Sequence, residues 1–81
     1  MSFRTIIFEN IDRVAREQER ILAPLTDDLL LENTGLDSLC WAILVARLED
    51  ELGIDPFETP EEGFMPVTVG DFVRAYDARS L

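Results

Sequence analysis

The chain has 81 residues, a formal net charge of −10 and no histidine. A chain of this length has room for one domain with a modest core, too small for a substrate cleft with a full set of catalytic groups. The lack of histidine removes the commonest general base and a favoured metal ligand. The single Cys40 excludes an internal disulfide. No signal-like segment or membrane-length apolar run is present, so we expect a soluble, cytoplasmic protein.

All seven basic residues are arginine, and the acidic excess grows along the chain. Residues 1–36 hold seven acidic residues against four arginines, whereas residues 37–81 hold ten against three. Such a surface repels nucleic acid and anionic membranes and attracts basic patches on protein partners. Composition alone favours a simpler interpretation, that the acidic residues keep a small protein soluble.

The first predicted element is an amphipathic helix over residues 3–20. Ile7, Ile11 and Val14 recur at helical spacing, with charged residues between them. Ile21 is a further candidate for the same apolar face.

A long connection over residues 22–36 follows, because Pro24 forbids easy continuation of the helix. Leucines occupy positions 22, 25, 29, 30 and 31. So many large apolar side chains predict that this loop is ordered and packed onto the core, and Thr34-Gly35 marks a turn near its end.

The second long helix is predicted from Ser38 to Leu52. Asp37 is a good N-cap residue, and Gly53 supplies a C-terminal stop. Residues 59–62, Thr-Pro-Glu-Glu, form a helix-start signature with room for about one turn. Residues 68–71 form another capped start, followed by a closing helix with an apolar face. We therefore expect an all-α fold, a small four-helix bundle with three main helices, one short helix and a long first loop.

The helix over residues 38–52 is apolar on two sides when its residues are placed about 100° apart. One stripe contains Trp41, Leu44, Val45, Leu48 and Leu52. The opposite stripe contains Leu39, Ala42, Ile43 and Ala46, with Glu49 and Asp50 at its end. In so small a domain the first stripe faces the core and the second is predicted to be a docking face for a protein partner. The alternative is that the leucine-rich loop covers the second stripe, and the stripes alone do not separate the two.

The start of the same helix carries a motif. Gly35-Leu36-Asp37-Ser38-Leu39 resembles the modification motif of acyl and peptidyl carrier proteins. The resemblance extends over residues 5–78, and it implies a single carrier domain of acyl-carrier type over residues 1–81. It also implies that Ser38 receives 4′-phosphopantetheine from coenzyme A, with Asp37 and Leu39 beside the attachment point and Leu39 contacting an incoming enzyme. A phosphate there would lie near free amides and the positive end of the helix dipole.

The resemblance also implies partners. Carriers of fatty acid synthesis usually have a carboxylate where Ile43 stands, whereas residues 53–57 look closer to free-standing carriers that work with adenylating ligases. The expected partners are a phosphopantetheinyl transferase, an adenylating acyl or aminoacyl ligase, and downstream acyl-transfer enzymes, each acting on a monomeric carrier that is not itself an enzyme. The cargo stays open between a fatty acyl group, an amino acid and a polyketide intermediate.

Two other functions compete with the carrier. A non-covalent helical adaptor would use the same apolar stripe and leave Ser38 unmodified. A small enzyme has little support, because no nucleophile, base or metal set is visible. Cys40 has no histidine, lysine or second cysteine to activate it, so a space-filling role is expected. The acidic pairs lack the spacing of a calcium loop, and no metal site is predicted.

Overall fold

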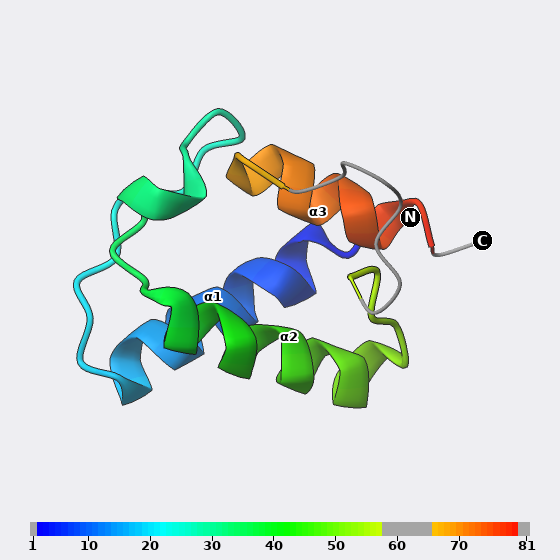
Figure 1. Cartoon of the computed structure of the whole chain (residues 1–81), viewed down its shortest axis with the longest axis horizontal. Helices are drawn as coiled ribbons and strands as arrows, with labels where there is room; N and C mark the ends of the chain where they lie inside the picture. Colours follow the sequence, from blue (N-terminus) through cyan, green and yellow to red (C-terminus); the bar gives the residue numbers. More distant parts are fainter. Residues whose placement is uncertain (1, 58–65, 80–81) are drawn as a thin grey trace.

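The computed structural model describes residues 2–57 and 66–79, and within these ranges the fold is all-α, with no named strand (Figure 1). The elements in chain order are α1 (Arg4–Glu17), a short 3₁₀ helix η1 (Leu31–Asn33), α2 (Ser38–Leu52) and α3 (Val69–Asp77). The three main helices confirm the all-α prediction. The short helix expected at residues 59–62 lies outside the described residues. No described helix combines the length and the apolar character that crossing a membrane requires.

Helix α1 ends at Glu17, three residues earlier than the sequence suggested. The Arg20 amide bonds to the carbonyl of Ala15 at 2.8 Å, and the Glu19 amide to that of Arg16 at 3.2 Å. These two bonds form a Schellman motif, in which the residue after the cap takes the left-handed conformation, and Glu19 has φ 55°. The prediction that Ile21 extends the apolar face of this helix is therefore wrong: Ile21 lies beyond the helix and is 93% exposed.

The first loop is ordered and packed, as its leucines predicted. Leu22, Leu25 and Leu31 pack against the core cluster. The backbone adds bonds from the Leu31 amide to the Val67 carbonyl and from the Val69 amide to the Leu29 carbonyl, both 2.9 Å. The loop therefore joins the start of α3 through backbone bonds as well as apolar contacts, and it contains the unpredicted η1.

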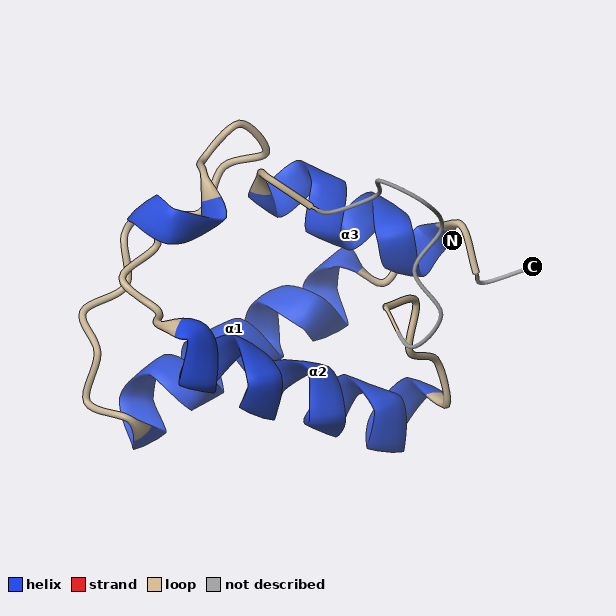
Figure 2. Ribbon diagram, viewed as in Figure 1, coloured by secondary structure: helices blue, strands red, loops and turns tan. Residues whose placement is uncertain are grey.

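Helices α1 and α2 pack against each other, and in the view of Figures 1 and 2 α3 lies above α2, with α1 running obliquely behind. Each helix contributes fully buried apolar side chains to one core. The members of that core are Ile7, Ile11, Val14 and Ala15 of α1, Cys40, Leu44 and Leu48 of α2, Phe72, Val73 and Tyr76 of α3, and Leu36 just before α2. The buried stripe of α2 is thus centred on Cys40 and Leu44, which rotates it away from Trp41 and Val45, both half-buried.

Aromatic side chains fill the space between α2, α3 and the turn that follows α2. The ring centroid of Phe72 lies 5.1 Å from that of Trp41, 5.6 Å from that of Phe57 and 5.2 Å from that of Tyr76. Such tilted and stacked pairs add to the stabilisation gained from area burial alone. Burial also raises the pKa of the Tyr76 phenol, because ionisation in an apolar setting is disfavoured.

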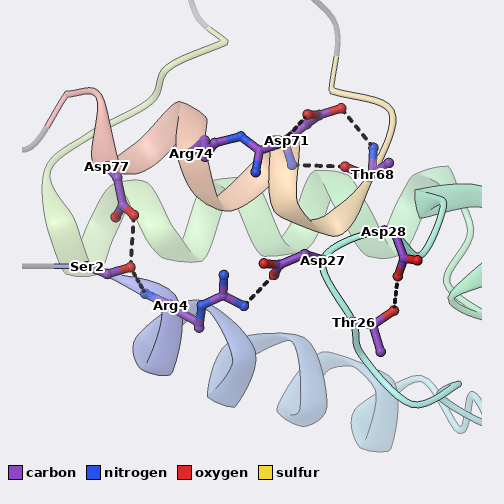
Figure 3. A network of polar contacts seen from close by, with 9 residues as sticks. All are labelled: Ser2, Arg4, Thr26, Asp27, Asp28, Thr68, Asp71, Arg74 and Asp77. Atoms are coloured by element: carbon purple, nitrogen blue, oxygen red, sulfur yellow. Dashed lines mark hydrogen bonds and ion pairs between the residues drawn. The ribbon is translucent and has the colours of Figure 1, made fainter.

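A polar network at the surface joins the N-terminal segment, the first loop and α3 (Figure 3). The Ser2 hydroxyl donates to Asp77 at 2.8 Å, and Arg4 pairs with Asp27 at 2.5 Å. The first bond joins the two ends of the described chain, and the second joins the start of α1 to the first loop.

Candidate functional site

The start of α2 has the geometry that its sequence predicts. Asp37 is extended, with φ −94° and ψ −178°, and its Oδ1 accepts a hydrogen bond from the Cys40 amide at 2.9 Å. The Trp41 amide bonds to the Asp37 carbonyl at 3.1 Å, which is the first bond of the helix. Ser38 is therefore the first residue with helical geometry, and its side chain is exposed. A hydroxyl in this place is open to an incoming enzyme.

The second carboxylate oxygen of Asp37 binds Arg20, which lies just after α1, where the first loop of the structure begins. The amide of Cys40 and the guanidinium of Arg20 together lower the pKa of the Asp37 carboxyl. Sequence patterns had not shown this pair, because the two residues lie on different elements and only the Schellman turn of α1 brings them together.

The backbone amides of Ser38 and Leu39 have no acceptor among the described residues. They are the first two of the orphan donors at a helix N-terminus, where the helix dipole is positive. Asp37 occupies the third donor, that of Cys40. An anion covalently attached at Ser38 would therefore find free N–H groups and positive potential close by.

Five of the six residues predicted for the docking face are exposed. They are Leu39, Ala42, Ala46, Glu49 and Asp50, and Leu39 is 60% exposed. The sixth, Ile43, is half-buried and packs against the core. The leucine-rich loop does not cover the five exposed residues. We call these five the α2 face, and it begins beside Ser38.

An apolar cavity of about 530 Å³ opens beside α2 and shares Ala42, Ala46 and Glu49 with the α2 face. Its wall is mostly aliphatic and aromatic, with two carboxylates near one end. The lining residues are Leu31, Trp41, Ala42, Val45, Ala46, Glu49, Asp55, Phe57, Pro66 and Phe72. Because the buried stripe of α2 is centred on Cys40 and Leu44, Trp41 and Val45 line this cavity and do not lie at the centre of the core. A volume of this size suits a small apolar group.

Among the described residues, no group of three or more His, Cys, Asp and Glu side chains could hold a metal ion. The acidic side chains of the first loop have local partners: Asp27 pairs with Arg4, and Asp28 accepts a hydrogen bond from Thr26. The thiol of Cys40 is free and buried beneath the start of α2, so it packs as a small apolar side chain.

Arg20 contacts the site through Asp37, and sequence patterns had not singled it out. Two further residues, Ile21 and Arg47, lie on the elements next to it. Arg47 crosses from α2 to Glu17 at the end of α1, at 2.5 Å. Ile21 leaves α1 as an exposed apolar side chain, and a side chain at Gly35 would collide with its carbonyl. The sequence had predicted a place only for Ile21, whose apolar spacing indicated the face of the first helix.

Comparisons with protein-family models, with curated proteins and with solved structures each found no match to this chain. Three features bear on the function: the geometry at the start of α2, the α2 face, and the resemblance of residues 35–39 to the carrier motif.

Proposed function

We propose that this protein is a covalent carrier that bears a 4′-phosphopantetheine arm on Ser38. One observation carries the proposal: Ser38 is an exposed serine at the first position of a helix whose capping carboxylate, Asp37, immediately precedes it. The arm would supply a terminal thiol that holds an acyl or aminoacyl group as a thioester. The chain itself would perform no catalysis.

The residues at the start of α2 fit such a group. The Ser38 hydroxyl oxygen would form a new bond to the β-phosphorus of coenzyme A. The bond from that phosphorus to the nucleotide breaks, the hydroxyl proton goes to a base of the transferase, and adenosine 3′,5′-bisphosphate leaves. The free amides of Ser38 and Leu39 would then lie close to the resulting phosphodiester.

The α2 face supports the second part of the proposal, recognition by enzymes. Its centre is the apolar strip of Leu39, Ala42 and Ala46, and Glu49 and Asp50 lie at its end. An interface of this kind gains affinity by desolvating its apolar centre, while its charges govern the encounter rate and orientation. Partners with a small apolar patch beside basic residues would suit it, as we propose for a phosphopantetheinyl transferase, an adenylating ligase and acyl-transfer enzymes. Tethering on the arm then raises the local concentration of cargo at each docked enzyme.

The adjacent cavity gives the cargo a resting place. Its apolar wall begins at Trp41, one helical turn from Ser38, and continues along α2 to Glu49. A hydrophobic acyl or amino acid side chain on the arm would bury part of its surface against this wall. The single tryptophan of the chain lines this cavity, so its fluorescence reports on occupation.

The test is the intact mass of the purified protein after incubation with coenzyme A and a phosphopantetheinyl transferase of broad specificity. The wild type should gain the mass of one arm, and Ser38→Ala should gain none while keeping the same circular dichroism spectrum. A wild type that never gains the arm would favour the non-covalent adaptor, which needs the α2 face but not the serine. A gain on Ser38→Ala would place the modification elsewhere and contradict the assignment.

A further inference from the structure

The backbone around Arg20 is fixed on both sides, and its side chain pairs with Asp37, the residue that precedes Ser38. Its amide bonds to the Ala15 carbonyl at the end of α1, and three residues later the Ala23 amide bonds to the Thr34 carbonyl at 3.0 Å. The preceding residue, Glu19, adopts φ 55°. A left-handed conformation costs a non-glycine residue about 1 kcal/mol, yet the chain adopts it and so turns Arg20 toward the start of α2.

The pair between Arg20 and Asp37 leaves unused bonding capacity. Asp37 uses one oxygen for the Cys40 amide and the other for Arg20. The guanidinium has five N–H donors in a planar fork, and within the described residues only its Nη2 has an assigned acceptor. The side chain of Arg20 is 44% exposed, so its remaining donors are open to a further acceptor.

A phosphodiester on Ser38 would add a second negative charge beside the Asp37 carboxylate. Two like charges on adjacent residues repel each other, and a cation held between them removes that cost. Arginine binds phosphate oxygens with two parallel hydrogen bonds, which lysine cannot do.

We propose that Arg20 is a positioning residue that binds the phosphodiester of the modified Ser38 while it keeps its contact with Asp37. This inference rests on the proposed carrier function. It assigns the first loop a part in fixing the root of the arm, so that only the distal part of the arm swings between docked enzymes. The whole phosphate site would then consist of Arg20 and the two free amides of α2.

The start of α3 offers a matched control. There Arg74 pairs at 2.6 Å with Asp71, a carboxylate that also accepts hydrogen bonds at a helix N-terminus. The residue at the first position of that helix is Val69, which has no hydroxyl to modify. Arg74→Gln therefore removes an arginine from a comparable capping carboxylate, without any effect expected on the arm.

The experiment is a thermodynamic cycle with wild type, Arg20→Gln, Arg20→Lys and Arg74→Gln, each in the unmodified form and with the arm, with conversion checked by intact mass. Urea unfolding gives the folding equilibrium constant of each form. A structural pair between Arg20 and Asp37 alone would affect both forms equally and cancel in the cycle. Attachment of the arm should lower that constant about fivefold more in Arg20→Gln than in wild type, as expected for an exposed charge pair.

Arg20→Lys should recover part of this difference, Arg74→Gln should show none, and 1 M salt should shrink it. The ³¹P resonance of the arm should also shift in Arg20→Gln and stay unchanged in Arg74→Gln. Equal responses of wild type and Arg20→Gln to the arm, with an unchanged ³¹P resonance, would overturn the role of Arg20 while leaving the carrier function intact. If the wild type gains no arm, the carrier function fails first and this inference fails with it.

Discussion

The starts of α2 and α3 are built from similar capping chemistry and have opposite surroundings. At α3 the first two residues, Val69 and Gly70, are buried, and their amides bond at 2.9 Å to the carbonyls of Leu29 and Asp27 in the first loop. A Cβ atom at Gly70 would lie only 2.9 Å from the Asp27 carbonyl oxygen. At α2 the first two residues are exposed, and their amides have no acceptor within the described ranges.

This difference separates a helix start that is buried against the first loop from one that is open to solvent. The start of α3 uses its orphan donors to bind the first loop, so its capping box and its buried residues serve stability. The start of α2 uses a single carboxylate to secure the helix and leaves a hydroxyl, two amides and an apolar face open to solvent. The exposed start is therefore the one that can accept a covalent group and present it to enzymes.

The largest difference between the two starts should be in the cost of truncating an apolar side chain. Val69→Ala removes buried methyl groups and should lower the free energy of unfolding by about 2 kcal/mol. Leu39→Ala removes a side chain that is 60% exposed and should change it by less than about 0.5 kcal/mol. Urea unfolding of both variants checks this. Equal losses would show that Leu39 packs as firmly as Val69, and the open character of α2 would then be wrong.

Recognition by partner enzymes should depend on the α2 face and not on the surface near α3. Ala46→Arg places a long cation in the apolar centre of a surface that we expect to meet a basic partner, so kcat/KM for transfer of the arm should fall about tenfold. Ala78→Arg, which adds the same charge at an exposed position just after α3, is the control and should leave transfer unchanged. Equal rates for both variants would move the interface away from this face.

The two hydroxyls at the helix starts should differ in their contribution to stability. The Thr68 hydroxyl accepts the Asp71 amide at 3.1 Å, so Thr68→Ala should lower the free energy of unfolding by about 1 kcal/mol. The Ser38 hydroxyl has no hydrogen bond within the described ranges, and Ser38→Ala should change stability by less than about 0.5 kcal/mol. Thermal unfolding measures both effects. A clear loss of stability in Ser38→Ala would indicate a structural role for the Ser38 hydroxyl.

The smallest effect should be a pH dependence that comes from Asp37. Its carboxyl has a pKa below the ordinary value of 3.8, because the charged form accepts the Cys40 amide and pairs with Arg20. A lowered pKa in the folded state gives stability that is present above about pH 4 and is lost as the pH falls through the folded pKa. Asp37→Asn keeps a capping oxygen but carries no charge. Wild type should therefore melt at a higher temperature than Asp37→Asn at pH 7, and the difference should shrink progressively as the pH falls below about 4. A constant difference across this range would show that the charge of Asp37 adds nothing.

The local features of the fold were predictable because they follow from neighbouring residues. Asp37 and Gly53 mark the two ends of α2, and Thr68 marks the start of α3, through capping and left-handed preferences that act within a few positions. The exposure of Leu39 and Ala46 followed from helical spacing in a domain too small to bury both sides of α2.

The tertiary features were not predictable from these patterns. Glu19 takes the left-handed conformation that glycine usually takes at the end of a helix. No local sequence signal therefore predicted that α1 ends before Ile21. The orientation of α2 is set by its contacts with α1 and α3, which place the small Cys40 at the core and Trp41 at the cavity. The pair between Arg20 and Asp37 depends on the same packing, and no spacing rule connects residues so far apart.

The most direct test of the difference between the two helix starts is to locate the arm within the modified chain. The protein, which has serines only at positions 2, 38 and 80, is converted with coenzyme A and a transferase, digested, and fragmented by mass spectrometry. We expect one arm per chain, found only on the peptide that contains Ser38. An arm on Ser2 or Ser80, or a chain that stays unmodified with transferases of broad specificity, would contradict the assignment of the start of α2 as the reactive site.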